Sequence, residues 1–67
     1  MKFKERFIEE LKNSKLTQKQ LADKLGINNS NITKWKQGEN LPSLEVFYEL
    51  CVLLGESADY MLGLKDE

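Results

Sequence analysis

All four glycines of this 67-residue chain, Gly26, Gly38, Gly55 and Gly63, stand at the end of a short segment with a helical pattern. Apolar residues three and four positions apart share one face of an α-helix, and a glycine directly after such a segment is a common C-terminal stop. No alternating run of apolar and polar residues is long enough for a convincing strand. The sequence therefore predicts an all-α fold, a compact bundle of five short helices around one core.

The five expected helices span residues 3–13, 17–25, 28–38, 43–54 and 57–63. Thr17 with Gln20 three positions later is a capping-box pattern, and Asn28, Ser43 and Ser57 stand where helices are expected to begin. The apolar side chains expected to face the core are Phe3, Phe7, Ile8, Leu11, Leu21, Ala22, Leu25, Leu44, Phe47, Leu50, Cys51 and Leu54. Residues 65–67 are expected to fray as the tail of a single domain over residues 1–67.

The segment 28–38 has few apolar residues for a helix in a small bundle. Ile32 and Trp35 share one face, and Trp35 is expected to pack in the core rather than to stack on a base. The opposite face carries hydrogen-bonding side chains at the spacing that normally marks a buried stripe, with Asn29 at its exposed end: Ser30, Thr33, Lys34 and Gln37. The segment is predicted to be held by two apolar anchors and to present a polar stripe outward.

The net charge of −1 conceals a strong division of charge along the chain. Residues 1–38 carry nine Lys and Arg against four acids, a balance of +5, whereas residues 39–67 carry one Lys against seven acids, a balance of −6. Such asymmetry can orient one face toward a polyanion, although a solvated surface with many ion pairs would give the same counts.

The chain has one cysteine and no histidine. Because a single cysteine cannot form an internal disulfide, a reducing cytoplasm is the expected compartment. An ordinary zinc site and His-based acid–base catalysis both need residues that the chain lacks, so no metal, cofactor or small-molecule effector is expected. No apolar run approaches the ~18 residues of a membrane helix, and the N-terminal segment has too many acids and too short an apolar stretch for a signal peptide. An enzyme is the least favoured class of function.

Residues 18–37 resemble the helix-turn-helix of the Cro/repressor family, the XRE-like regulators of phages and bacteria. That family has glutamine at the start of its second helix, a small residue where the two helices cross, and glycine in the turn, and Gln18, Ala22 and Gly26 match. Ile32 and Trp35 match its two apolar anchor positions. The G-x-x-x-P of residues 38–42 and the LG-x-S-x-D-Y-x-L-G of residues 54–63 extend the resemblance over residues 3–64.

The resemblance implies a lambda-repressor-like domain that binds double-stranded DNA and acts as a transcriptional regulator, a repressor. The residues implied to contact bases are Asn29, Ser30, Thr33 and Lys34. The residues expected to contact phosphates are Thr17, Gln18, Asn28, Lys36, Gln37 and Asn40. A homodimer on a palindromic operator is implied, with its contact formed by the last helix and the loop before it, over residues 56–64, in which the apolar Leu64 is the foremost candidate.

The sequence departs from that family at two places. Many members hold a buried arginine of the first helix against a glutamate near the end of the third, and the matching positions here are Leu11 and Lys36. Because both partners are replaced together, no buried charge is left without a partner. The loop after the third helix is often basic in the family but is Glu39-Asn40 here, which should weaken its attraction to phosphate and increase the dependence on dimerisation.

Two other functions compete with DNA binding. A protein-interaction module, such as an antitoxin-like or co-regulator subunit, would suit the acidic second half of the chain. A small acidic carrier protein would need an exposed serine after aspartate at the start of a helix. That context is absent at Ser30, Ser43 and Ser57, and the basic first half argues against this function as well.

Overall fold

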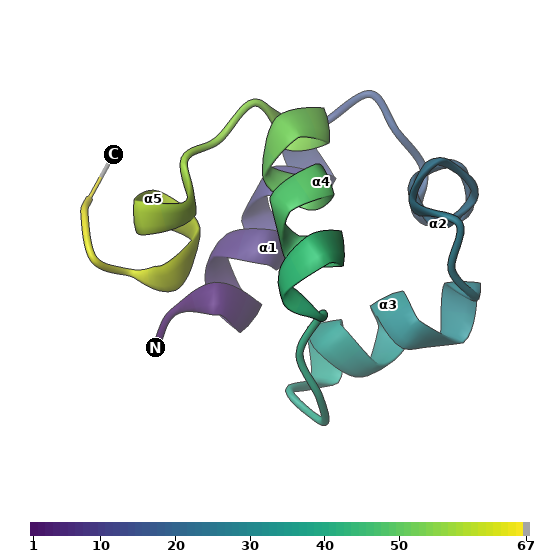
Figure 1. The fold of residues 1–67 in the computed structure, drawn as a ribbon, viewed down its shortest axis with the longest axis horizontal. Helices are drawn as coiled ribbons and strands as arrows, with labels where there is room; N and C mark the ends of the chain where they lie inside the picture. Colours follow the sequence, from purple (N-terminus) through teal and green to yellow (C-terminus); the bar gives the residue numbers. More distant parts are fainter. Residues whose placement is uncertain (67) are drawn as a thin grey trace.

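The computed structural model describes residues 1–66 and shows five helices and, within that range, no strand. The helices are α1 (Phe3–Asn13), α2 (Gln18–Leu25), α3 (Asn29–Gln37), α4 (Leu44–Leu54) and α5 (Ala58–Leu62). Figure 1 shows α3 along one edge of the molecule, with α2 and α5 on opposite sides of α4. The predicted all-α, five-helix fold is confirmed. None of the described helices is both long enough and apolar enough to cross a membrane.

Side-chain caps begin four of the five helices, as the sequence predicted. The Thr17 hydroxyl accepts from the Gln20 N–H at 3.1 Å, and the Gln20 side chain accepts from the Thr17 N–H at 2.9 Å. Asn28, Ser43 and Ser57 cap α3, α4 and α5 by accepting a backbone N–H of the first turn. These bonds satisfy N–H groups that the helices leave without partners, so local sequence fixes where each helix starts.

Aromatic side chains of α1 and α3 form the centre of the core. The rings of Phe3 and Phe7 stack with their centroids 5.4 Å apart, and Trp35 meets both edge-on. The buried side chains are Phe3, Phe7, Leu21, Ala22, Leu25, Ile32, Trp35, Leu50, Cys51 and Met61. Both anchors predicted for the third helix are therefore in the core, and α3 is attached to the body of the domain through them.

Two residues expected to face the core are instead on the surface. Leu44 is 82% exposed although it lies seven positions, about two turns, before the buried Cys51 and so on the same side of α4, because the core does not extend to the first residue of this helix. Ile8 is 37% exposed, because one position along a helix turns it about 100° away from the buried Phe7. The two exposures have different causes, since Ile8 is turned away from the core and Leu44 lies at the end of its helix.

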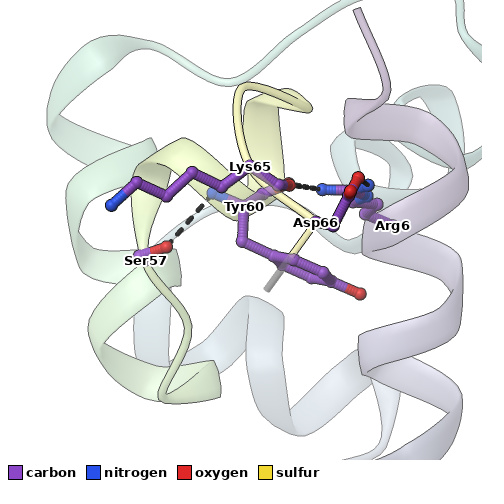
Figure 2. Close-up of polar contacts among 5 residues, drawn as sticks. All are labelled: Arg6, Ser57, Tyr60, Lys65 and Asp66. Carbon is purple, nitrogen blue, oxygen red and sulfur yellow. Dashed lines mark hydrogen bonds and ion pairs between the residues drawn. The ribbon is translucent and has the colours of Figure 1, made fainter.

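The segment after α5 is joined to α1 through Arg6. The Arg6 guanidinium donates to the carbonyl of Tyr60 at 2.6 Å and to the carbonyl of Lys65, and it lies 3.8 Å from the Asp66 carboxylate. Figure 2 shows these groups gathered around the Tyr60 ring. Residues 65 and 66 of the expected frayed tail thus make defined contacts, and residue 67 lies outside the described residues.

Candidate nucleic-acid interface

Helix α3 presents a polar stripe on the side opposite its two buried anchors. Ile32 is fully buried and Trp35 is 4% exposed, which fixes the rotation of the helix about its own axis. The exposed side chains of α3 include Asn29, Ser30, Thr33, Lys34 and Gln37. All four residues expected to contact bases are therefore on the surface, and α3 contains no acidic residue.

The N-terminus of α2 lies against this stripe through Gln18. The Gln18 Nε2 group donates to the Thr33 hydroxyl oxygen at 2.8 Å and to the Asn29 carbonyl oxygen at 3.3 Å. Its Oε1 atom accepts from the Lys36 ammonium at 2.9 Å. A single glutamine thus connects a residue expected to read a base with one expected to contact a phosphate.

Thr17 and Asn28, both expected to contact phosphate, are the N-cap residues of α2 and α3. Each uses its side-chain oxygen as a cap, so the hydroxyl proton of Thr17 and the amide N–H groups of Asn28 are the donors that remain for an anion. The first turn of α2 contains Lys19 and no acidic residue. The first N–H groups of α2 and this positive charge make the end of the helix favourable for an anion.

The opposite end of α3 carries Gln37, the last helical residue, and Asn40 in the exposed loop that follows. Lys4 of α1 lies across this end. Its Cδ and Nζ atoms are 3.3 and 3.9 Å from the position that a Cβ atom would take on Gly38. Gly38 has φ of +76°, so the chain turns out of α3 in a conformation that other residues rarely adopt, directly beneath the lysine side chain.

Lys4 is a candidate site residue that the sequence did not identify. It is separated from Gly38 by 34 positions, and only the packing of α1 against α3 brings them together. The positive balance of residues 1–38 included Lys4 without indicating where it would lie. In the structure it places a cation where the loop itself offers only Glu39 and Asn40.

The two positions that depart from the family pattern also have defined surroundings. Leu11 is partly buried and packs against the core. Lys36 is partly buried, and its ammonium group is bonded to Gln18 rather than to a carboxylate. A neutral acceptor leaves the charge of Lys36 intact at the surface between α2 and α3.

The described residues contain no group of three or more His, Cys, Asp or Glu side chains arranged to hold a metal ion. The arrangement around α3 offers hydrogen-bond donors, acceptors and cations, without a carboxylate on the helix itself. It is suited to recognition of a polyanion with polar edges.

Comparison with known proteins identifies the family. The family model described as helix-turn-helix matches residues 8–61. The phage CTXphi transcriptional repressor RstR of Vibrio cholerae is 36% identical over 63 residues, which cover 94% of this chain and 56% of that protein. The HTH-type transcriptional regulator ImmR of Bacillus subtilis is 39% identical over 51 residues, which cover 76% of this chain and 39% of that protein.

The chain thus spans about half the length of the first of these relatives and less of the second. No solved structure matches it significantly. The family match includes all of α2, α3 and α4, the part of the fold that carries the exposed polar stripe and its anchors. The chain belongs to the XRE-type helix-turn-helix family of DNA-binding transcriptional regulators.

Proposed function

We propose that this protein binds double-stranded DNA sequence-specifically and represses transcription, with α3 in the major groove. The observation that carries the proposal is the stripe of exposed polar side chains on α3, held outward by the burial of Ile32 and Trp35. The major groove is about 12 Å wide and admits one α-helix. The side chains proposed to read base edges are Asn29, Ser30, Thr33 and Lys34.

The proposed phosphate contacts lie at the two ends of this stripe. At one end are the N-terminus of α2 and the residues around it, and at the other is the turn after α3. The residues of this set are Thr17, Gln18, Asn28, Lys36, Gln37 and Asn40. Contacts of this kind fix the register of a protein on DNA without selecting a sequence.

A homodimer on a palindromic operator is part of the proposal, because one nine-residue helix reads only a few base pairs. Two copies of α3 about 34 Å apart would read half-sites one helical turn apart. Residues 56–64 are proposed to form the contact, together with exposed apolar residues of α4. Two neighbouring grooves, of about 290 and 510 Å³, support this placement, and both include Leu44, Phe47 and Leu62.

Repression is proposed on the basis of the relative that is named a phage transcriptional repressor. The other relative is named only a transcriptional regulator, so the sign of regulation rests on the first. The protein would act in the cytoplasm, where the DNA of phages and bacteria is transcribed.

Selection from a random pool of double-stranded DNA at about 100 mM salt, below physiological ionic strength, tests the proposal. Enrichment of a two-fold symmetric site with half-site centres about 10 base pairs apart would establish a dimeric sequence reader. Failure of a folded sample to enrich any sequence would contradict it. The protein-interaction module would then be favoured, with the grooves beside α4 as the surface to search.

A further inference from the structure

The contacts of Gln18 have a direction that the chemistry of its neighbours dictates. A lysine ammonium can only donate hydrogen bonds, so the Gln18 atom 2.9 Å from Lys36 Nζ must be the oxygen. A backbone carbonyl can only accept, so the Gln18 atom 3.3 Å from the Asn29 oxygen must be the nitrogen. Two independent partners therefore fix which end of the Gln18 amide is oxygen and which is nitrogen.

This orientation also fixes the role of the Thr33 hydroxyl. The Gln18 nitrogen lies 2.8 Å from Thr33 Oγ1 and carries only hydrogens, so the hydroxyl oxygen accepts this bond. The Thr33 proton must therefore point away from Gln18. Within α3, the usual alternative acceptor for a threonine hydroxyl is the carbonyl one turn earlier, which here belongs to Asn29.

The Asn29 carbonyl has no free lone pair for this proton. A carbonyl oxygen has two lone pairs. The helical geometry of α3 assigns one of them to the N–H of residue 33, and Gln18 donates to the same oxygen. Thr33 is exposed and donates no side-chain hydrogen bond within the described residues, so its proton is left for a group outside the chain.

We propose that Gln18 occupies one lone pair of the Thr33 hydroxyl and leaves its proton free, so that Thr33 acts in the major groove as a hydrogen-bond donor. Bonds run in one direction, from Lys36 to Gln18, from Gln18 to Thr33, and from Thr33 to a base. The inference rests on the proposed function, because it assigns to Thr33 a preference for a base edge with an acceptor. Guanine offers two acceptors in the major groove, whereas cytosine offers only its amino donor.

The side chain of Gln18 is thus a positioning group, which leaves the backbone N–H of this first residue of α2 for the proposed phosphate contact, and Thr33 determines specificity. This role differs from packing of the threonine methyl group on a thymine, which would not depend on Gln18. A donor hydroxyl should favour guanine over cytosine at the base it contacts by about 3- to 10-fold, the range expected for one hydrogen bond.

The test compares five variants on a set of DNA duplexes carrying every single base-pair change in the selected operator. Thr33→Val removes the hydroxyl at nearly constant shape, and the operator position where it abolishes discrimination is the one that Thr33 contacts. Thr33→Ser keeps the hydroxyl and should keep the preference for guanine over cytosine. Lys24→Gln changes a lysine beside the C-terminal half of α4 and lowers the net charge by one, so it is the control for the charge change in Gln18→Glu.

Gln18→Glu is the decisive variant. A carboxylate can accept from Lys36 but cannot donate to Thr33, so the Thr33 proton should turn toward it and leave only lone pairs, and no donor, for the groove. The guanine-over-cytosine ratio at this position should fall below one, with cytosine now preferred. The double variant Gln18→Glu/Thr33→Val should show no preference at this position, which separates the reversal from the general loss of affinity caused by the new negative charge.

The outcomes are distinct. Reversal with Gln18→Glu and loss with Thr33→Val would support the inference. An unchanged preference for guanine in the Gln18→Glu protein, or unchanged discrimination at every position in the Thr33→Val protein, would overturn it while leaving the proposed function intact. A folded wild-type protein with no sequence preference would overturn the proposed function, and this inference with it.

Discussion

The guanidinium carbon of Arg6 lies 4.3 Å from the centre of the Tyr60 ring, and the same group donates to the Tyr60 carbonyl at 2.6 Å. This pair joins the first helix of the domain to the last. Helix α5 has only five residues, far below the length at which an isolated helix is stable, so its place depends on such tertiary contacts. Met61, on the same helix, is fully buried and adds an apolar anchor.

Arg6→Met should lower the free energy of unfolding by about 1–2 kcal/mol. Methionine keeps part of the aliphatic stem but loses the interaction with the ring and the hydrogen bonds to the carbonyls of Tyr60 and Lys65. Urea unfolding followed by circular dichroism measures the change. Lys12→Met, an exposed position on the same helix, should stay within about 0.5 kcal/mol of the wild type. Equal stabilities of the two variants would show that Arg6 does not hold the C-terminal segment.

Lys34→Ala should relax base preference at one operator position and cost about 1–3 kcal/mol of binding free energy on the preferred sequence. Lys34 is exposed on the polar stripe, and its ammonium has no hydrogen-bond or ion-pair partner among residues 1–66, so it is free to reach a base edge. Affinities for single base-pair variants of the operator measure the effect. A loss of equal size on every sequence would instead assign Lys34 to a phosphate.

Lys4→Gln should weaken binding about equally on all sequences and reduce the slope of log K against log salt by about 0.9, the contribution of one phosphate contact. The reason is the position of the Lys4 side chain across Gly38, at the end of α3 where the loop has no cation of its own. Lys24→Gln removes the same charge beside the C-terminal half of α4 and should leave the slope nearly unchanged. Identical slopes for the two variants would show that Lys4 does not contact a phosphate.

The difference between Lys4 and Thr17 explains how much of this site the sequence could predict. The caps at Thr17, Asn28 and Ser43 involve residues two or three positions apart, and the two anchors of α3 lie three apart, so local spacing was enough to find them. The contact of Lys4 with Gly38 depends on how α1 packs on α3, and no local pattern encodes that packing.

The same limit applies to Gln18 and Lys36, which were expected separately as phosphate contacts and turn out to be bonded to each other. They are 18 positions apart and come from different helices. The exposure of Leu44 has a similar cause, since how far the core extends toward the first turn of α4 depends on the packing of other helices and not on the spacing within α4.

Glu10→Gln should stabilise the protein at neutral pH by a few tenths of a kcal/mol, the size of a like-charge pair on a helix. Burial raises the pKa of Glu10 above its ordinary value, and the neighbouring carboxyl of Glu56 raises it further. The folded protein therefore holds this proton more tightly than the unfolded chain, so the group's contribution to stability falls as pH rises from about 4.5 through the raised pKa.

Urea unfolding at several pH values checks this prediction. The stabilities of the wild type and Glu10→Gln should differ at pH 7 and converge below about pH 4, where the Glu10 carboxyl is protonated in both the folded and the unfolded protein. Glu49→Gln, which changes an exposed glutamate on α4, is the control measured at the same pH values. A Glu10→Gln protein less stable than the wild type at pH 7 would contradict the raised pKa.

Leu44→Glu should weaken self-association and operator binding together while leaving the fold intact. Leu44 is 82% exposed, so its replacement removes almost no core packing, and an acid at the first position of α4 interacts favourably with the helix N-terminus. In a dimer that covers the grooves beside α4, however, the new carboxylate would be buried against apolar groups without a partner. Sedimentation equilibrium and operator titration measure the two effects, with Ile8→Glu on α1 as the exposed apolar control. If Leu44→Glu dimerised and bound DNA like Ile8→Glu, the dimer contact would have to lie away from these grooves. Residues 56–64 could then take part in it only through a side of α5 that faces away from the grooves.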